Sequence, residues 1–250
     1  MFFLKSRNID DPKTIENYHA DLIQKKPYLR NIYIDFYKQL RLYISPLGNK
    51  VIVELGSGGG FIKEIVPQAI TSDIMKLKNI DMQFSALDIP FEKNSVDAFL
   101  MIDVMHHVSD VRRMFNELNR CLKKGGKIIM IEPANTLWGG FIYKYFHHEL
   151  FNPKAIWKFK PKGPMSSSNL SLPWIVFVRD RQIFERLFPY LKILNIKPHT
   201  PFMYLLSGGL RFPQLVPSFT YELFNNIEKL LKKFNPYIGM FYTIELKKNN

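Results

Sequence analysis

Cysteine is almost absent from this sequence, and long apolar runs are absent altogether. Among 250 residues the only cysteine is Cys121, so a disulfide framework and a cysteine-ligated metal cluster are both excluded. Lys, Arg, Pro or Gly interrupts each apolar run well before the ~18 residues that a membrane-spanning helix needs. The opening segment MFFLKSRNIDDPK has a very short apolar run followed by acids, unlike a secretory signal. We therefore expect a cytoplasmic protein in which Cys121 is a buried structural thiol.

Acidic residues are in the minority. The chain has 22 Asp and Glu against 35 Lys and Arg, which gives a formal net charge of +13. A basic surface favours acidic partners, namely nucleic acid, anionic lipid or an anionic substrate. The alternative is that the lysines only form a solvated surface, as is common in the proteins of a lysine-rich proteome. With 46% hydrophobic residues the chain can bury one sizeable core, and we expect a single domain, residues 1–250, with decorations.

The predicted elements follow the order of an α/β protein. Residues 14–26 and 28–44 place apolar side chains three and four positions apart, as helices do, and Pro27 separates the two segments. The predicted strands are 50–55, 69–74, a part of 81–88, 95–103, 127–133, 192–200 and 238–248, and the later predicted helices are 59–69, 111–126, 179–191 and 218–234. This alternation indicates βαβ units and a mostly parallel sheet with helices on both faces.

Four glycines follow the first predicted strand in the segment VIVELGSGGGFIKE, residues 51–64. Glycine allows positive φ and removes the Cβ that would keep a ligand away from the backbone, so this turn suits a nucleotide or an anion. A P-loop ends in Gly-Lys-Ser/Thr, which is missing here, and the dinucleotide fingerprint needs glycine where Phe61 stands. The spacing is instead G-x-G-x-G at Gly56, Gly58 and Gly60, with Glu54 two residues before it.

This loop resembles motif I of the class I S-adenosylmethionine-dependent methyltransferases, in their small-molecule branch with a type 11-like domain. Further segments resemble the family in the right order: TSDI with Asp73, SALDIPFEKNSVDAFLM, IDVMHHVSD and NELNRCLKKGGKIIMIEP. The match covers residues 48–134, and it implies a Rossmann-like fold with a mostly parallel seven-stranded sheet. The implied parts are a helical cap at 1–45, a cofactor-binding core at 46–134, a lid-like substrate-side insert at 135–216, and a last helix and strand at 217–250.

The resemblance also implies S-adenosyl-L-methionine as the cofactor. The binding residues that it implies are Glu54, Gly56, Ser57, Gly58, Gly60, Asp73, Ser85, Ala86, Asp88, Ile102 and Asp103. Glu54 would brace the glycine loop or bind the ammonium group of the cofactor. Asp73, about 20 residues after the loop, would accept hydrogen bonds from both ribose hydroxyls.

Two further parts of the implied cofactor site come later in the chain. The adenine contact is left open between Ser85, Asp88 and the backbone of Ala86. Ile102 and Asp103 end the fourth predicted strand, and open α/β sheets bind ligands beyond the carboxyl ends of their strands. We therefore expect Ile102 and Asp103 to line the floor of the pocket.

The implied reaction is an in-line displacement at the sulfonium methyl carbon, which needs an aligned nucleophile and a dry site. A general base is required only for a poor nucleophile, such as a sugar hydroxyl or a phenol. His106, His107 and Glu132 are candidates, and His147 or His148 in the following insert competes with them. Adjacent histidines on a helix point about 100° apart, so we expect only one of the first pair to face the pocket. The lone cysteine and the scattered histidines lack ligand spacing, and we expect no metal site.

The acceptor is expected to bind outside the cofactor core. Residues 135–216 are rich in aromatic and basic side chains, and one stretch interleaves the two kinds: Trp157, Lys158, Phe159, Lys160 and Lys162. This combination suits an anionic membrane surface, at the inner face of the membrane; the alternative is a solvated loop. The segments WIVFVRDRQIFERLFPYLKI and YLLSGG loosely resemble methyltransferases encoded beside bacterial glycosyltransferases, which suggests a small-molecule or lipid-linked sugar acceptor.

Two other functions fit the same core. A catalytically silent protein would keep the methyltransferase fold as a scaffold, but the intact glycines and Asp73 argue against that role. An RNA methyltransferase is suggested by the positive charge. Base-modifying relatives usually carry an Asn/Asp-Pro-Pro-Tyr/Phe type motif after the fourth strand, and IDVMHH lacks it. Nucleic acid is therefore not the partner that we expect.

Overall fold

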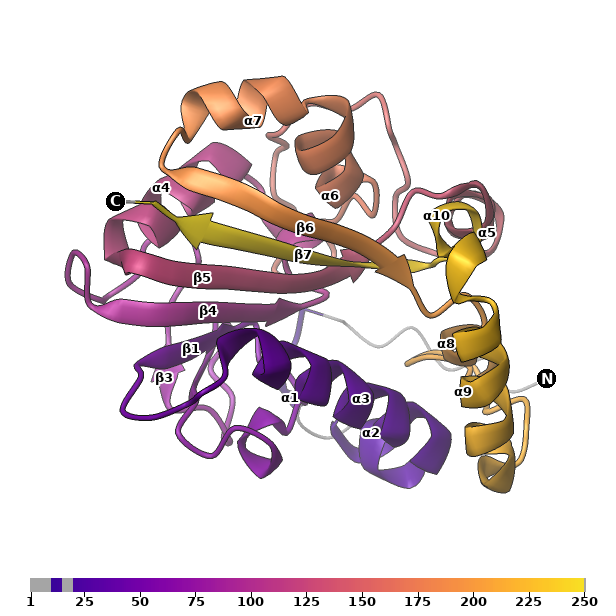
Figure 1. Ribbon diagram of the computed structural model, residues 1–250. Coiled ribbons are helices and arrows are strands. Elements are labelled where there is room, and N and C mark those ends of the chain that lie inside the picture. Colours follow the sequence, from indigo (N-terminus) through magenta and orange to yellow (C-terminus); the bar gives the residue numbers. More distant parts are fainter. Residues whose placement is uncertain (1–9, 15–19, 250) are drawn as a thin grey trace.

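The sheet has seven strands in the order β3-β2-β1-β4-β5-β7-β6 (Figure 1). The computed structural model describes residues 10–14 and 20–249. The strands are β1 (Ile52–Leu55), β2 (Ile70–Asp73), β3 (Met82–Gln83), β4 (Val96–Ile102), β5 (Leu122–Pro133), β6 (Leu191–His199) and β7 (Phe241–Lys248). Pairs from β3 to β5 are parallel, and β7 runs antiparallel to both β5 and β6. The predicted mostly parallel, seven-stranded α/β sheet is confirmed.

The central strands are apolar on both faces. Successive side chains of a strand point to opposite sides, and here the two sides belong to two separate core clusters. One side of β4 and β5 carries Phe99, Met101, Ile128 and Met130, and the other carries Ala98, Leu100, Ile129 and Ile131. Parallel sheets of this kind need cover on both faces, so the sheet forms the middle layer of the molecule.

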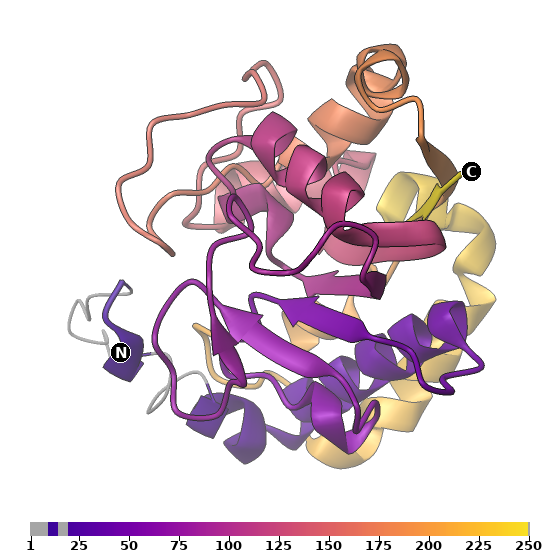
Figure 2. The ribbon, with the colours of Figure 1, turned by 90° about the vertical axis from the view of Figure 1, so that its left-hand side faces the viewer.

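Helices provide that cover on both faces (Figures 1 and 2). The first cluster is closed by α4 (Val111–Cys121), α6 (Leu172–Trp174), η4 (Ile175–Arg179) and α7 (Arg181–Leu187). The second is closed by α2 (Ala20–Lys25), α3 (Pro27–Ile44), α5 (Leu137–Phe146), α8 (Met203–Leu206) and α9 (Tyr221–Leu230). The short elements that remain are α1 (Pro12–Thr14), η2 (Ile62–Glu64), η3 (Met105–His107), η5 (Ser218–Thr220), η6 (Lys232–Phe234) and α10 (Asn235–Ile238).

The N-terminal helices agree with the predicted periodicity where the chain is described. Pro27 opens α3 at a position where its missing N–H costs nothing. Residues 1–9 and 15–19 of the predicted helical cap lie outside the described residues. Among the helices of the described chain, none combines the length and the apolarity that crossing a bilayer requires.

Two predicted helices are shorter than expected. The helix predicted at 59–69 is only the single turn η2, because Pro67 follows it and cannot donate a backbone hydrogen bond. The helix predicted at 111–126 ends at Cys121, since Leu122 pairs with Val96 as the start of β5. Gly125 there has φ +75°, a conformation outside any right-handed helix.

Helix α5 lies in the stretch after Pro133, where the sequence shows no regular pattern. Its N-cap is Thr136, whose hydroxyl oxygen accepts the Gly139 backbone N–H at 2.9 Å. Gly139 and Gly140 lower its intrinsic helix propensity, but a Cβ at Gly140 would come 2.6 Å from the Asn135 side-chain oxygen. Tight packing therefore explains why this helix contains two glycines.

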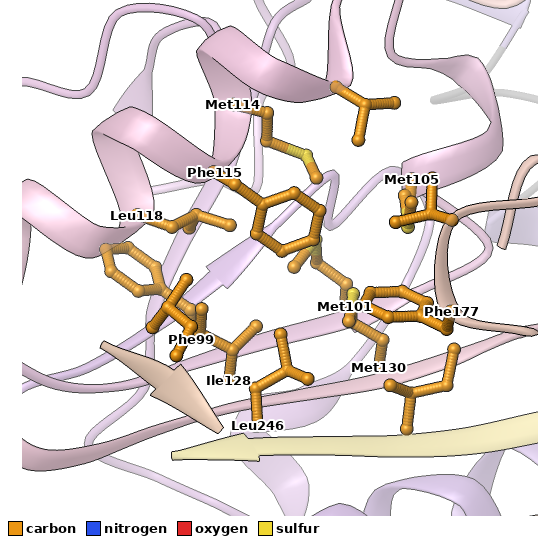
Figure 3. Packing of buried hydrophobic residues seen from close by; sticks show 14 of the residues in the cluster. Phe99, Met101, Met105, Met114, Phe115, Leu118, Ile128, Met130, Phe177 and Leu246 are labelled. Carbon is orange, nitrogen blue, oxygen red and sulfur yellow. The ribbon is translucent and has the colours of Figure 1, made fainter. Parts of the chain in front are cut away.

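Aromatic rings on three helices form the centre of the first cluster. The Phe115 ring on α4 lies 5.8 Å from the ring of Phe177 (Figure 3). It also lies 5.1 and 5.6 Å from the rings of Phe184 and Phe188. Cys121 at the end of α4 is fully buried in the same cluster, and its thiol lies 3.3 Å from the Phe91 carbonyl oxygen. Burial raises the pKa of this thiol. The expected buried thiol is therefore found.

Truncating the central ring should destabilise the whole domain. Phe115 is fully buried, so we expect Phe115→Ala to lower the free energy of unfolding by about 3–5 kcal/mol through lost burial and a residual cavity. The matched control is Phe219→Ala, because Phe219 is 86% exposed and should change stability by less than about 0.5 kcal/mol. Urea denaturation followed by circular dichroism measures both; equal effects would contradict the assigned core.

Candidate functional site

A cavity of about 1400 Å³ opens at the carboxyl edge of the parallel strands. Four strand ends contribute to its wall: Gly56 follows β1, Asp73 ends β2, Asp103 follows β4 and Pro133 ends β5. The sheet order reverses between β1 and β4, and open α/β sheets bind ligands at such a switch point. The opposite wall comes from segments 142–170 and 204–215.

The glycine loop forms the part of the wall nearest β1. Gly56 and Gly58 have φ of +64° and +50°, a left-handed conformation that only glycine adopts without strain. A Cβ at Gly56 would lie 2.5 Å from Val104 Cγ2, and a Cβ at Gly60 would collide with the Tyr37 hydroxyl. One side of the loop therefore packs closely against Val104 and Tyr37. The loop also lines the cavity.

Two buried carboxylates flank this loop. Glu54 is 2% exposed, and its Oε2 has no hydrogen-bond partner within the described chain. Burial raises the pKa of Glu54 to about 7, although hydrogen bonds from Ser57 and Tyr37 act in the opposite direction. Asp73 accepts the Gly58 N–H at 3.0 Å and the Met75 N–H at 2.9 Å, and burial raises its pKa too. Each Asp73 oxygen keeps a lone pair for a further donor.

The segment after β3 places two of the three adenine-side candidates at the cavity. Ser85 and Ala86 line it, whereas Asp88 is exposed and does not. Asp88 instead donates its backbone N–H to the Ser85 carbonyl at 2.9 Å. Ile102 and Asp103 line the cavity as expected. Of the cofactor-side residues chosen from the sequence, all except Asp88 therefore share one wall.

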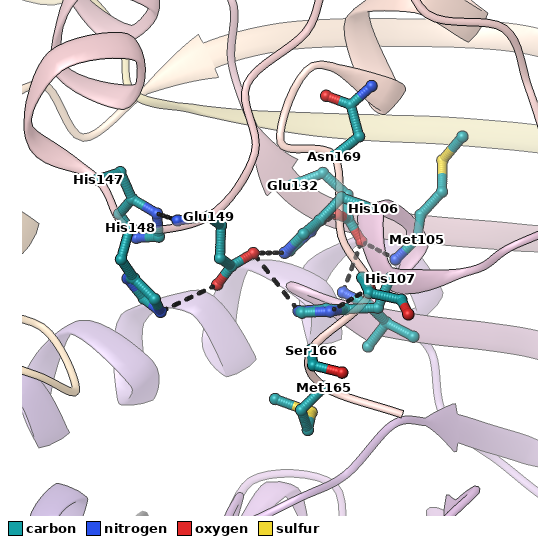
Figure 4. A network of polar contacts seen from close by, with 12 residues as sticks. Met105, His106, His107, Glu132, His147, His148, Glu149, Met165, Ser166 and Asn169 are labelled. Carbon is teal, nitrogen blue, oxygen red and sulfur yellow. Dashed lines mark hydrogen bonds and ion pairs between the residues drawn. The ribbon is translucent and has the colours of Figure 1, made fainter. Parts of the chain in front are cut away.

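Glu132 lies behind the cavity wall and holds His106 and the loop after β4 in position. It is fully buried at the end of β5 and does not line the cavity. Its Oε1 accepts the backbone N–H groups of Val104 and Met105 at 2.9 and 2.7 Å, and its Oε2 lies 2.8 Å from His106 Nδ1 (Figure 4). With three donors on one carboxylate, Glu132 acts on the site through the position of His106.

His106 and His107 both line the cavity. The expectation that only one of them would face it is wrong, because they lie on the 3-10 turn η3 and their ring centroids are 4.2 Å apart. Burial lowers the pKa of His106, but the hydrogen bonds and charges of Glu132 and Glu149 raise it to about 10. Burial lowers the pKa of His107 to about 4. At neutral pH a charged and a neutral imidazole therefore lie side by side.

Glu149 is the functional candidate that the sequence patterns missed. Its Oε2 lies 3.5 Å from His106 Nε2 and 3.9 Å from His107 Nε2, and its Oε1 lies 3.9 Å from His148 Nε2 (Figure 4). Burial raises its pKa, yet the neighbouring histidines hold it well below the usual range of a carboxyl group. The histidines are thus not scattered, as their sequence spacing suggests; the signal that could have found the cluster is the adjacent run His147–Glu149.

In the basic and aromatic stretch near residue 160 the three lysines are exposed, but the tryptophan is not. Trp157 is buried in the first cluster, and its indole N–H donates to Asp180 Oδ2 at 2.8 Å. Lys158 lies 2.8 Å from Asp110 in an ion pair. Lys162 lines the cavity, so one lysine of the three reaches the site.

Removing the carboxylate behind His106 should destabilise the fold. Glu132→Ala leaves three buried donors without their acceptor, and we expect a loss of about 3–5 kcal/mol in the free energy of unfolding. The matched control is Glu64→Ala, because the Glu64–Arg30 pair lies at the surface, with 50% of the Glu64 side chain exposed, and should contribute at most about 1 kcal/mol. Urea titration compares them; a Glu132 variant as stable as the control would contradict the assigned network.

Comparison with known proteins agrees with this geometry. Residues 53–130, from β1 to β5, match the family model described as "Methyltransferase domain". The demethylmenaquinone methyltransferase of Bacillus cereus is 25% identical over 134 residues, which are 51% of this chain and 55% of that protein. The chain thus matches about half of the length of this curated relative.

Solved structures share the fold over most of the chain. A methyltransferase from Archaeoglobus fulgidus, described as dependent on S-adenosylmethionine, is similar over 86% of this chain and 94% of that one, with a TM-score of 0.51 and 17% identity. The geranyl diphosphate C-methyltransferase of Streptomyces coelicolor is similar over 98% and 89%, with a TM-score of 0.51 and 16% identity. At these identities the similarity establishes the fold.

Proposed function

We propose that this chain moves a methyl group from S-adenosyl-L-methionine to a small-molecule or lipid-linked acceptor. It has the fold of the class I S-adenosylmethionine-dependent methyltransferases, and residues 53–130 match the methyltransferase domain model. The observation that carries the proposal is the cavity, in which the glycine loop, Glu54 and Asp73 meet at the switch point of the sheet.

The residues of the cavity fit the cofactor. The Glu54 oxygen that lacks a partner within the described chain suits the ammonium group of the methionine part. Asp73 suits the ribose hydroxyls, since each of its oxygens keeps a lone pair. The glycine loop lets the cofactor approach the backbone. S-adenosylmethionine supplies an electrophilic methyl group, and the protein holds the acceptor in line with it and excludes water.

The acceptor side is formed by the segments beyond β5. Tyr143 and Tyr204 line the cavity together with the histidines around Glu149. Four side chains at the rim line the cavity and are also more than half exposed: Tyr145 62%, Phe146 65%, Phe212 57% and Leu215 66%. Arg211 and Lys162 line the same cavity. An apolar rim with basic groups suits an amphiphilic acceptor that carries an anionic or strongly polar head.

These segments correspond to the proposed substrate-side part of the domain. Residues 135–216 supply α5, the loop that follows it and the segment 204–215 to the cavity wall, and they also contribute β6 to the sheet. We assign the lid role to the cavity-lining portions, the cofactor core to 46–134, the helical cap to 1–45 and the last helix and strand to 217–250. Together they make one domain.

A helix beside the lid presents an apolar stripe to solvent. Along α9 and its flanking turns, exposed residues recur at intervals of three or four: Phe219 86%, Leu223 59%, Ile227 37%, Leu230 80% and Phe234 45%. Lysines 229, 232 and 233 lie next to the stripe. An apolar face beside basic groups lies well in the surface of an anionic bilayer. A peripheral position at the inner face of the membrane would bring a lipid-linked acceptor to the rim.

The cofactor assignment predicts a selective loss of binding. Asp73→Ala should weaken the binding of S-adenosylhomocysteine by about 1.5–3 kcal/mol, because it removes an ionised acceptor of two hydrogen bonds. Asp88→Ala is the matched control, since Asp88 lies outside the cavity, and should leave the affinity unchanged. Isothermal titration calorimetry measures both. Equal affinities of the Asp73 variant and the unmodified protein would refute the ribose assignment.

The membrane proposal predicts a lipid dependence. The protein should co-sediment with vesicles containing phosphatidylserine more than with phosphatidylcholine vesicles, and salt should weaken the binding because it screens the lysines. Leu230→Ser should reduce sedimentation several-fold. Leu42→Ser on α3 is the control, because Leu42 is 76% exposed on another helix, and should not. Negligible binding to both vesicle types would contradict the membrane proposal and would favour a water-soluble acceptor molecule.

A further inference from the structure

Three potential metal-ligand atoms converge at the acceptor side of the cavity. They are His106 Nε2, His107 Nε2 and Glu149 Oε2, and the donor atoms of these three residues lie within 4.8 Å of one another. Glu149 Oε2 is buried and faces His106 Nε2 at 3.5 Å and His107 Nε2 at 3.9 Å. All three residues line the cavity. In the absence of a metal ion the charged His106 forms an ion pair with Glu149, and a metal ion bound here would take the place of the His106 proton.

The other nitrogen of each imidazole is already occupied. His106 Nδ1 lies 2.8 Å from the Glu132 carboxylate, and His107 Nδ1 lies 3.1 Å from the Ser167 carbonyl oxygen. Neither of these partners can donate a hydrogen bond, so both Nδ1 atoms carry a proton. Nε2 of His107 therefore has a lone pair, and Nε2 of His106 has one as soon as a metal ion displaces the second proton of that ring. A carboxylate or carbonyl on the outer nitrogen is the arrangement that holds metal-binding histidines.

We propose that His106, His107 and Glu149 bind a divalent first-row transition metal ion, of which zinc is the representative. Two imidazoles and one carboxylate are a donor set that zinc uses when it keeps one coordination position open. Two ligand atoms of a tetrahedral zinc ion lie about 3.4 Å apart, and the two distances from Glu149 Oε2 are 3.5 and 3.9 Å. The open position faces the cavity, since all three residues line it.

Two neighbouring groups of residues are less suitable. Asp103, His106 and Glu132 also lie close together, but the Glu132 oxygens already accept from two backbone N–H groups and from His106. In the group formed by His147, His148 and Glu149, the Nδ1 atom of His147 accepts the Glu149 backbone N–H at 3.3 Å, and the His148 side chain is 43% exposed at the rim. His148 is therefore a matched control.

The role of the ion, though not the site itself, rests on the proposed function. A metal ion at this place would bind an oxygen or nitrogen atom of the acceptor and hold it beside the methyl group. The acceptor would then be a molecule with a hydroxyl, carboxylate or amine near its reacting atom. Lid residue Glu149 and loop residues His106 and His107 would be joined through the ion, so metal binding would also tie the lid to the core.

Zinc titration of the full-length, chelator-treated protein tests the site. Calorimetry should show one Zn²⁺ bound per chain. Glu149→Gln and His107→Gln each remove one of three ligands and should weaken binding by more than about 100-fold, beyond the 10–100-fold typical of residues that only orient a ligand. His148→Gln should stay within about threefold of the unmodified protein. S-adenosylhomocysteine should bind the unmodified protein and the three variants equally. Equal binding shows that the variants are folded, and a loss of this binding in every protein would contradict the proposed function without contradicting the zinc site.

Cobalt substitution provides a readout that does not depend on the variants. Co²⁺ bound to the unmodified protein should give the strong visible bands of a four- or five-coordinate ion, and Glu149→Gln should lose them. The proposal is overturned if Zn²⁺ does not bind, if only the weak bands of hydrated Co²⁺ are seen, or if His148→Gln loses zinc as Glu149→Gln does. In the first case the three residues hold a proton instead of a metal.

Discussion

The loop after β4 takes its position from one carboxylate, Glu132. This side chain ties the end of β5 to two backbone N–H groups of the loop and to His106. The same loop carries Asp103 on one side and the histidines on the other. These three bonds therefore fix the wall proposed for the cofactor relative to the wall proposed for the acceptor. A buried carboxylate with all its partners rigidifies its surroundings, and one without them is costly.

The cavity is acidic inside a basic protein. Glu54, Asp73, Asp103 and Glu149 line it, while the chain as a whole has a net charge of +13. Burial raises the pKa of Glu54 and of Asp103 to about 7, so burial opposes the ionisation of both carboxyl groups at neutral pH. A positively charged ligand stabilises the ionised forms. The charge pattern thus favours a cationic cofactor inside the cavity and anionic partners at the protein surface.

That the residues proposed for the cofactor line one cavity could be predicted from the sequence, because their determinants are local. A strand followed by Gly56, Gly58 and Gly60, then an acid at Asp73, lies within about 20 residues and has a fixed order in nucleotide folds. Asp88 departs from that reading because the turn at Ser85 directs it to solvent. The acceptor half is different: His106 and Glu149 are 43 positions apart, in segments without periodicity, and only tertiary packing brings them together. The burial of Trp157 is equally a result of long-range packing.

The last strand also bears on how the molecule forms. Strand β7 (Phe241–Lys248) lies between β5 and β6 and is hydrogen-bonded to both. Until residues 241–248 are available, β5 and β6 are unpaired edges, and unpaired edges are templates for aggregation. Its partner β5 begins more than a hundred residues earlier, so this pairing closes a very long loop, which slows folding. During synthesis the cofactor core can therefore assemble before the sheet is complete, and the half-built β5 edge is the part of the nascent chain that most needs protection.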